Sequence, residues 1–176
     1  MSDVFTLHDW ERLPEGFPAQ LIEGQLVKEP SPTYGHQRTG ARIRHALATL
    51  VGPDRVPDTP ADVLVDDQNV YQPDIVVLAR PVDDATPFVG VPLLAVEVLS
   101  PSTRRRDRSV KAGRLLGLGV GEVWLVDPDA RAIEVRASAY VLRAGPGETV
   151  TSRILPAFAL DADDLFAPPA APDIRH

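Results

Sequence analysis

Residues 93–129 read LLAVEVLSPSTRRRDRSVKAGRLLGLGVGEVWLVDPD, two apolar runs separated by a polar, arginine-rich segment. The runs at 93–99 and 122–126 are typical of buried strands. The segment between them predicts a helix from about Thr103 to Leu116 that ends at the glycines that follow. Glu97 stands near the end of the first run, where a carboxylate is costly unless a cation, a hydrogen-bond network or a metal ion compensates it. The stretch therefore predicts strand, helix and strand in succession, with a candidate functional residue on the first strand.

The remaining sequence predicts further short elements on both sides of this stretch. Glu23-Gly24 between Leu21-Ile22 and Leu26-Val27 predicts a hairpin, and apolar residues at helical spacing predict a helix from about Tyr34 to Leu50. We also expect a short helical lead-in within 1–17, strands at about 61–66, 70–79, 139–143 and 149–155, a loop at 80–92, and a hairpin of 122–126 with 132–136. The strands near 139–143 and 149–155 are expected to complete the sheet. We expect one domain over 1–166 and a flexible tail at 167–176.

Composition narrows the class of protein. A chain of 176 residues that is 44% hydrophobic can form one globular domain with a proper core. It has no apolar stretch of membrane-spanning length and no signal-peptide pattern, so we expect a cytoplasmic protein without membrane association. It has no cysteine, which excludes disulfides, thiolate zinc sites and cysteine nucleophiles.

Asp74 heads a second apolar run, and its position relative to Glu97 can be predicted. Only 13 residues, 80–92, separate the two expected strands, too few for a helical crossover, so we expect antiparallel pairing. Asp74 and Glu97 would then be neighbours, with Cβ atoms about 5 Å apart. Carboxylate oxygens favour Mg²⁺ or Mn²⁺ over zinc. The alternative is that Asp74 caps a strand and Glu97 pairs with an arginine.

The arginine-rich helix contributes a second candidate group. Asp107 and Lys111 fall on the same arc as Leu115 and Leu118, which must face the sheet, so we expect Lys111 to reach the two carboxylates. The alternative is a solvated ion pair of Asp107 with Lys111. Two carboxylates holding a cation beside an ammonium suit phosphodiester hydrolysis, because the cation activates water and neutralises charge on the phosphate.

The basic residues indicate where a nucleic acid would bind. The net charge of −7 argues against a protein that coats nucleic acid without sequence preference, because phosphate binding needs a basic surface. A local basic cluster stands out against this charge, and we expect it to contact DNA: Arg104, Arg105, Arg106 and Arg108.

At these residues the chain resembles the Uma-type family of putative restriction endonucleases, in the PD-(D/E)XK nuclease superfamily. The resemblance runs from about Leu21 to Phe166. It rests on 72–75 (QPDI), on 96–103 (VEVLSPST), on Asp107, Lys111 and Gly119-Val120, and on 124–128 (WLVDP).

The resemblance implies an α/β fold: a mixed sheet flanked by helices, here with extra N-terminal and C-terminal strands. It implies a DNA substrate and a weakly bound Mg²⁺ or Mn²⁺, with Asp74 and Glu97 as ligands and the main-chain carbonyl of Val98 as a further one. Cutting both strands usually takes two sites, so we expect a homodimer.

The sequence departs from the family pattern at several places, among them Leu115 and Val123, which stand where tyrosine is common. Leu99 stands where the superfamily has its lysine, so that role would pass to Lys111. Gln20 stands where relatives often have glutamate, which would remove a supporting acid. His36 matches a frequent family histidine that would face the site; the alternative is a local hydrogen bond at the start of its helix. These departures leave two alternatives to an active nuclease: a degenerate nuclease fold that binds DNA or protein without cutting, and a structural domain whose acids pair with arginines.

Overall fold

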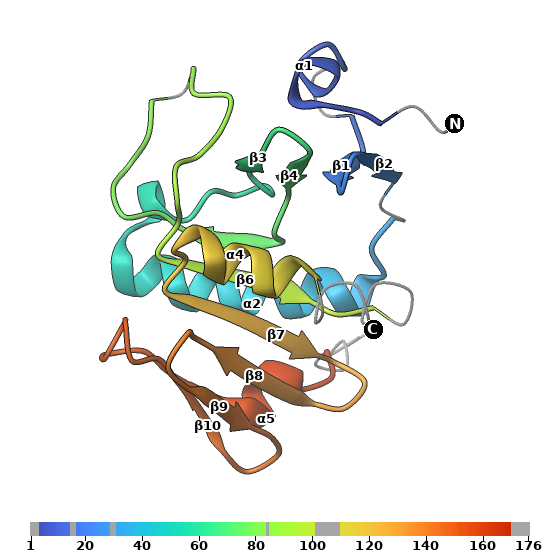
Figure 1. Cartoon of the computed structure of the whole chain (residues 1–176). Helices are drawn as coiled ribbons and strands as arrows, with labels where there is room; N and C mark the ends of the chain where they lie inside the picture. The colour runs from blue at the N-terminus through green and yellow to red at the C-terminus, as the bar shows by residue number, and fades with distance from the viewer. Residues whose placement is uncertain (1–3, 15–16, 29–30, 84, 101–109, 170–176) are drawn as a thin grey trace, which may run out of the picture.

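The computed structural model describes residues 4–14, 17–28, 31–83, 85–100 and 110–169. Figure 1 shows the course of the chain. Its helical elements are α1 (Leu7–Trp10), α2 (Tyr34–Val51), η1 (Pro53–Arg55), α4 (Ala112–Leu118) and α5 (Ala162–Phe166). Its strands are β1 (Ala19–Ile22), β2 (Gln25–Lys28), β3 (Val63–Asp66), β4 (Asn69–Tyr71), β5 (Ile75–Val77), β6 (Leu94–Val98), β7 (Glu122–Asp127), β8 (Ala132–Arg136), β9 (Val141–Ala144), β10 (Thr149–Thr151) and β11 (Ala159–Asp161).

A mixed five-stranded sheet forms the centre, in the order β5-β6-β7-β8-β9. Strands β6 and β7 run parallel and all other neighbours in this sheet run antiparallel. Every residue of β6 and β7 is buried, as their near-continuous apolar sequences require of strands covered on both faces. The expected mixed α/β sheet is therefore confirmed.

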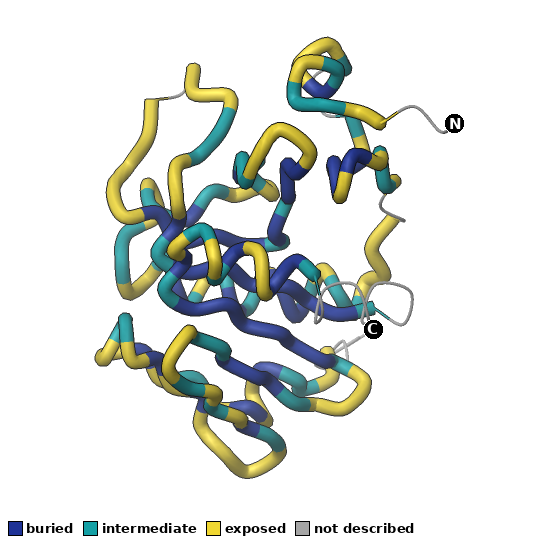
Figure 2. Tube along the Cα trace, in the orientation of Figure 1, coloured by how far each residue is buried: buried dark blue, intermediate teal, exposed yellow. Residues whose placement is uncertain are grey.

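Helices cover the two faces of this sheet, because alternate residues of each strand point to opposite sides. Val96 and Trp124 pack with Ile43 of α2. Ala95 and Val123 pack with Leu115 of α4, on the other face. Figure 2 shows the resulting continuous buried layer along the central strands.

The N-terminal strands form a second sheet in the order β2-β1-β4-β3. Glu23 and Gly24, with φ of 50° and 71°, join β1 to β2 and confirm the expected hairpin. Two successive residues with positive φ match the twist that a tight hairpin needs. Among the described residues, no helix is both long enough and apolar enough to cross a bilayer.

The structure corrects the expected strand at 70–79. It is two strands: β4 pairs with β1 and β3, whereas β5 pairs with β6 in the central sheet. The chain changes sheet at 72–74, where Pro73 has no N–H to donate to a ladder.

The C-terminal strands are also arranged differently from the expectation. The strand near 149–155 is shorter, 149–151, and pairs with the unforeseen β11 in a separate two-stranded sheet instead of completing the central one. The described part of the arginine-rich helix, α4, ends at Gly119 with φ of 106°, the left-handed conformation usual after a helix. Residues 103–109 of that expected helix lie outside the described residues.

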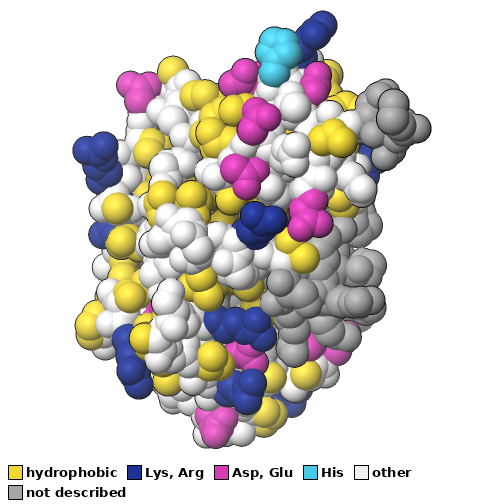
Figure 3. Space-filling model, in the orientation of Figure 1, with side chains coloured by type: hydrophobic (Ala, Val, Ile, Leu, Met, Phe, Trp, Pro, Cys, Tyr) yellow, Lys and Arg dark blue, Asp and Glu magenta, His cyan; other side chains and the backbone are white. Residues whose placement is uncertain are grey.

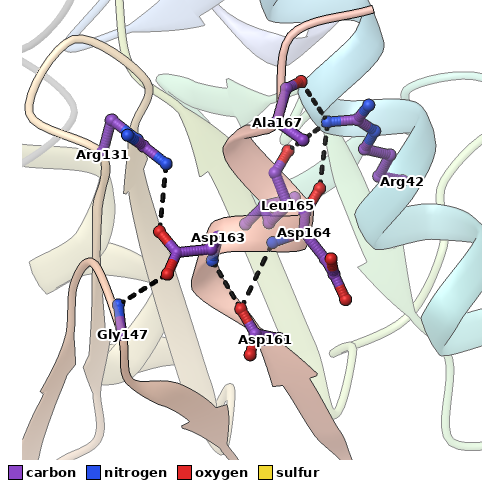
Figure 4. A network of polar contacts seen from close by, with 8 residues as sticks. All are labelled: Arg42, Arg131, Gly147, Asp161, Asp163, Asp164, Leu165 and Ala167. Carbon is purple, nitrogen blue, oxygen red and sulfur yellow. Dashed lines mark hydrogen bonds and ion pairs between the residues drawn. The ribbon is translucent and has the colours of Figure 1, made fainter. Parts of the chain in front are cut away.

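The start of the expected tail is anchored to α2, as Figure 4 shows. Arg42 Nη1 donates to the carbonyls of Asp164, Leu165 and Ala167, at 3.1, 2.8 and 2.7 Å. Arg42 thus caps the C-terminal end of α5, where the Asp164 carbonyl also accepts a hydrogen bond of 3.4 Å from the Ala167 N–H. The remainder of the tail, 170–176, lies outside the described residues.

Candidate active site

Asp74 and Glu97 occupy facing positions on the antiparallel strands β5 and β6. Ile75 pairs with Val96 in this ladder, so continuing the register by one residue sets Asp74 opposite Glu97. The expected antiparallel pairing is thus confirmed. Among the described residues of the connection at 78–93 there is no helix, and parallel strands usually need one to cross over.

Asp74 lies at the mouth of this site, and two neighbours hold its carboxylate. Its side chain is 28% exposed. Oδ2 accepts a hydrogen bond of 2.7 Å from the Val98 N–H, which ties the carboxylate to the neighbouring strand. His36 Nε2, on the first turn of α2, lies 3.4 Å from the same oxygen. His36 therefore lies against the Asp74 carboxylate rather than making only a local contact.

Arg44 holds Asp74 through the main chain. Its Nη2 donates to the Asp74 carbonyl at 2.9 Å, and its Nε donates to the Pro57 carbonyl at 2.9 Å. Sequence reasoning missed this residue, because an arginine on an amphipathic helix usually lies in solvent and no local pattern marks a contact 30 residues away. Helix α2 thus fixes Asp74 at both its carboxylate and its backbone.

Glu97 and Lys111 form a buried ion pair. Glu97 is 4% exposed and Lys111 is 1% exposed. Lys111 Nζ lies 2.6 Å from Glu97 Oε1. Two buried charges are tolerated only when each compensates the other, so the pair explains how a carboxylate stands inside the apolar β6. Lys111 points inward from the start of α4, as its helical position predicts.

Gln20 supports the segment that leads into Asp74. It is buried on β1, and its Oε1 accepts a hydrogen bond of 2.9 Å from the Gln72 N–H. Burial raises the pKa of nearby Asp62, while a hydrogen bond from the Gln72 side chain acts in the opposite direction. The uncharged Gln20 side chain thus fixes the backbone at Gln72, two residues before Asp74.

Several predicted residues lie outside the described residues. They are Arg104, Arg105, Arg106, Asp107 and Arg108. Within the described residues, no group of three or more His, Cys, Asp or Glu side chains is arranged to hold a metal ion. Two carboxylates facing each other are nevertheless hard oxygen donors of the kind that Mg²⁺ and Mn²⁺ bind, with water completing the shell. The donor set therefore fits a weakly bound divalent cation.

Comparison with known proteins identifies the family. The model of the family described as "Uma2: Putative restriction endonuclease" matches residues 6–163, most of the chain. The chain belongs to this family. No curated protein matches the chain.

A solved structure supports the same fold. It is the crystal structure of a putative nuclease of the DUF820 family from Anabaena variabilis. The two chains share 23% identity with a TM-score of 0.79, over 92% of this chain and 97% of that one. The expected restriction-endonuclease-like fold is therefore confirmed, and this Uma2 family membership supports a nuclease function.

Proposed function

We propose that this Uma2 protein is a divalent-metal-dependent endonuclease that hydrolyses phosphodiester bonds in DNA. The observation that carries the proposal is a partly exposed carboxylate, Asp74, opposite a buried carboxylate, Glu97, that is paired with a buried lysine, Lys111. A buried charge cluster of this kind is costly for folding and is typical of active sites.

Asp74, Glu97 and the main-chain carbonyl of Val98 would hold Mg²⁺ or Mn²⁺. Two protein carboxylates bind such an ion weakly and leave several water ligands on it. When bound, the cation lowers the pKa of water and neutralises charge on the reacting phosphate.

The chain's own groups then have distinct roles. The Lys111 ammonium donates to the attacking water or to the charge that develops on the phosphate. The Val98 N–H and Arg44 keep Asp74 in place. His36, with Nε2 3.4 Å from the Asp74 carboxylate, helps to orient it.

The remaining assignments come from the sequence. Gln20 and Asp107 are supporting residues, and Arg104, Arg105, Arg106 and Arg108 contact the DNA backbone. A homodimer would bring two sites to the two strands of a duplex.

The test is cleavage of supercoiled plasmid and linear duplex with Mg²⁺ or Mn²⁺, against the same reactions in EDTA. We expect nicking or linearisation that is lost in Asp74→Asn. Glu134→Gln is the matched control, since it makes the same kind of change at a carboxylate on β8 and should still cut. Absence of cleavage with either ion, from a folded wild-type protein, would overturn the proposal.

A second candidate is a degenerate nuclease fold that binds DNA or protein without cutting. It is favoured by the lack of a third acidic or histidine ligand grouped with the two carboxylates among the described residues. It predicts that DNA binding survives both Asp74→Asn and EDTA and that no ion restores cleavage.

A further inference from the structure

Helix α2 differs in charge from the rest of the chain. Its 18 residues contain three arginines and two histidines and no aspartate or glutamate, in a protein with 25 acidic residues and a net charge of −7. Arg42 and Arg44 donate to main-chain carbonyls and so serve the fold. Arg38 does not: among the described residues, no carboxylate lies within ion-pair distance of it.

Arg38 lies instead beside an exposed aromatic ring. Its Cζ is 5.9 Å from the ring centroid of Tyr34, one helical turn earlier. Tyr34 is 75% exposed, more than any other exposed large hydrophobic residue of the described chain. A ring that far into solvent contributes little to the core, whereas its cation–π contact with Arg38 restrains its orientation.

This pair lies at the helix end that reaches the candidate active site. His36, two residues after Tyr34, contacts Asp74, while Tyr34 and Arg38 point away from the buried side of α2. The face shown in Figure 3 has a different character: acidic side chains gather over the N-terminal sheet. There Glu23 and Asp66 contact Arg114 of α4. By its composition, with arginines and no acidic residue, helix α2 is suited to contact a polyanion.

We propose that Tyr34 and Arg38 form a contact for the nucleic-acid strand that flanks the reacting phosphate. The Tyr34 ring stacks on a base that is unpaired beside the cut, and Arg38 pairs with the adjacent phosphate. Aromatic stacking tolerates any base sequence, because every base has a π face. This inference deepens the proposed function and rests on it.

The test measures binding apart from cleavage. A short fluorescein-labelled DNA, single-stranded or duplex, is titrated with protein in EDTA, and fluorescence anisotropy gives Kd at several salt concentrations. Loss of one stacked base costs roughly 1–3 kcal/mol, so we expect Tyr34→Ala to weaken single-strand binding about fivefold or more. We expect Tyr34→Phe, which keeps the ring, to stay within about twofold.

Arg38→Gln should weaken binding to both DNA forms. It should also reduce the slope of log K against log salt by about 0.7–0.9, the loss of one phosphate contact. Arg80→Gln is the matched control, because Arg80 is exposed at the far end of β5, and it should leave Kd and slope unchanged.

The outcomes separate this inference from the proposed function. If the wild-type protein cleaves DNA but Tyr34→Ala and Arg38→Gln bind like wild type, the contact is wrong and the nuclease proposal stands. If Tyr34→Ala instead turns a dimer into a monomer with unchanged Kd, the face binds a second copy and the contact is again wrong. If the wild-type protein binds neither DNA form, both proposals fail.

Discussion

Glu97 and Glu122 are buried glutamates on neighbouring parallel strands, and their surroundings differ completely. Glu97 lies near the end of β6 opposite Leu125, and Glu122 begins β7 opposite Leu94. Glu122 is fully buried and accepts hydrogen bonds of 2.5–2.8 Å from Tyr140 Oη, the Arg153 N–H, Trp124 Nε1 and Ser152 Oγ. Glu97 faces the Lys111 ammonium and a second carboxylate.

The difference teaches how to separate a structural carboxylate from a functional one. Four fixed, uncharged donors satisfy Glu122 and join β7 to the segments at 140 and 152–153, at the sheet end away from Asp74. Burial, and then the hydrogen bond to Glu122, raise the pKa of Tyr140 to about 12, so its hydroxyl remains a donor at neutral pH. Glu97 instead pairs with the charged Lys111, opposite the partly exposed Asp74, where the proposed function places the cation and the substrate. Burial alone therefore does not identify the functional residue; the type of partner does.

The same substitution at the two glutamates should lower the cleavage rate only at Glu97. Both variants should lose stability, because Glu97→Gln leaves the buried Lys111 without its carboxylate. We expect Glu97→Gln to lower the cleavage rate about 10³-fold or more, because it removes a proposed cation ligand. Glu122→Gln places an NH₂ group against two donors and leaves them unpaired, so the free energy of unfolding should fall by about 3 kcal/mol. Urea unfolding and cleavage rates below the unfolding transition measure the two effects. Equal rate loss in both variants would break the comparison.

Substitutions of Lys111 test whether the charged partner of Glu97 is needed for cleavage. Lys111→Met keeps the apolar stem and removes the charge, so we expect the cleavage rate to fall about 10²-fold. Lys111→Arg should rescue poorly, because a planar guanidinium cannot occupy the same point. Lys28→Met, at the exposed end of β2, is the control.

Folding should respond to Lys111→Met as well. The variant leaves Glu97 buried without its lysine, which should cost about 3 kcal/mol of stability. Mn²⁺ should restore part of that loss in thermal unfolding. A variant that cut at the wild-type rate would reduce Lys111 to a structural partner of Glu97.

Substitution of Arg44 tests how much the cleavage rate depends on the position of Asp74. Without its two carbonyl contacts Asp74 is held less firmly, so we expect Arg44→Gln to lower kcat about tenfold with little change in KM for DNA. Arg42→Gln is the matched control on the same helix, since it removes the contacts to α5 and should lower stability but spare kcat. A rise in KM with unchanged kcat in Arg44→Gln would place Arg44 in DNA binding instead.

Glu134 on β8 is a third buried glutamate, and its partners are two arginines, Arg136 and Arg143. Its substitution should have the smallest effect of those considered. Burial raises its pKa, but hydrogen bonds from Arg136 and Arg143 outweigh that and hold the pKa below the ordinary 4.5. Its contribution to stability is therefore complete above pH 4.5 and is lost as pH falls through the lowered pKa. We expect Glu134→Gln to cost less than about 1 kcal/mol at pH 7. Unfolding curves at pH 7 and pH 3 should show the difference shrinking in acid; a difference that grows in acid would contradict it.

Much of the site could be predicted from local pattern. The short loop at 80–92 dictated antiparallel β5 and β6, and with them the facing positions of Asp74 and Glu97. Helical spacing turned Lys111 toward the sheet, because its arc carries the apolar residues that must be buried. These are consequences of period and loop length, which a single sequence contains.

Other features depended on contacts between distant segments. The sequence contains Pro73, which can interrupt a strand, but only the packing of two separate sheets divides 70–79 into β4 and β5. Strands β10 and β11 pair residues that are 8 to 12 positions apart, and Arg44 contacts Asp74 across 30 positions. Three of the four donors around Glu122 come from 18 to 31 positions away. A side chain selects such partners only after the core has brought them together, and that assembly decided which buried glutamate is structural and which lies at the candidate active site.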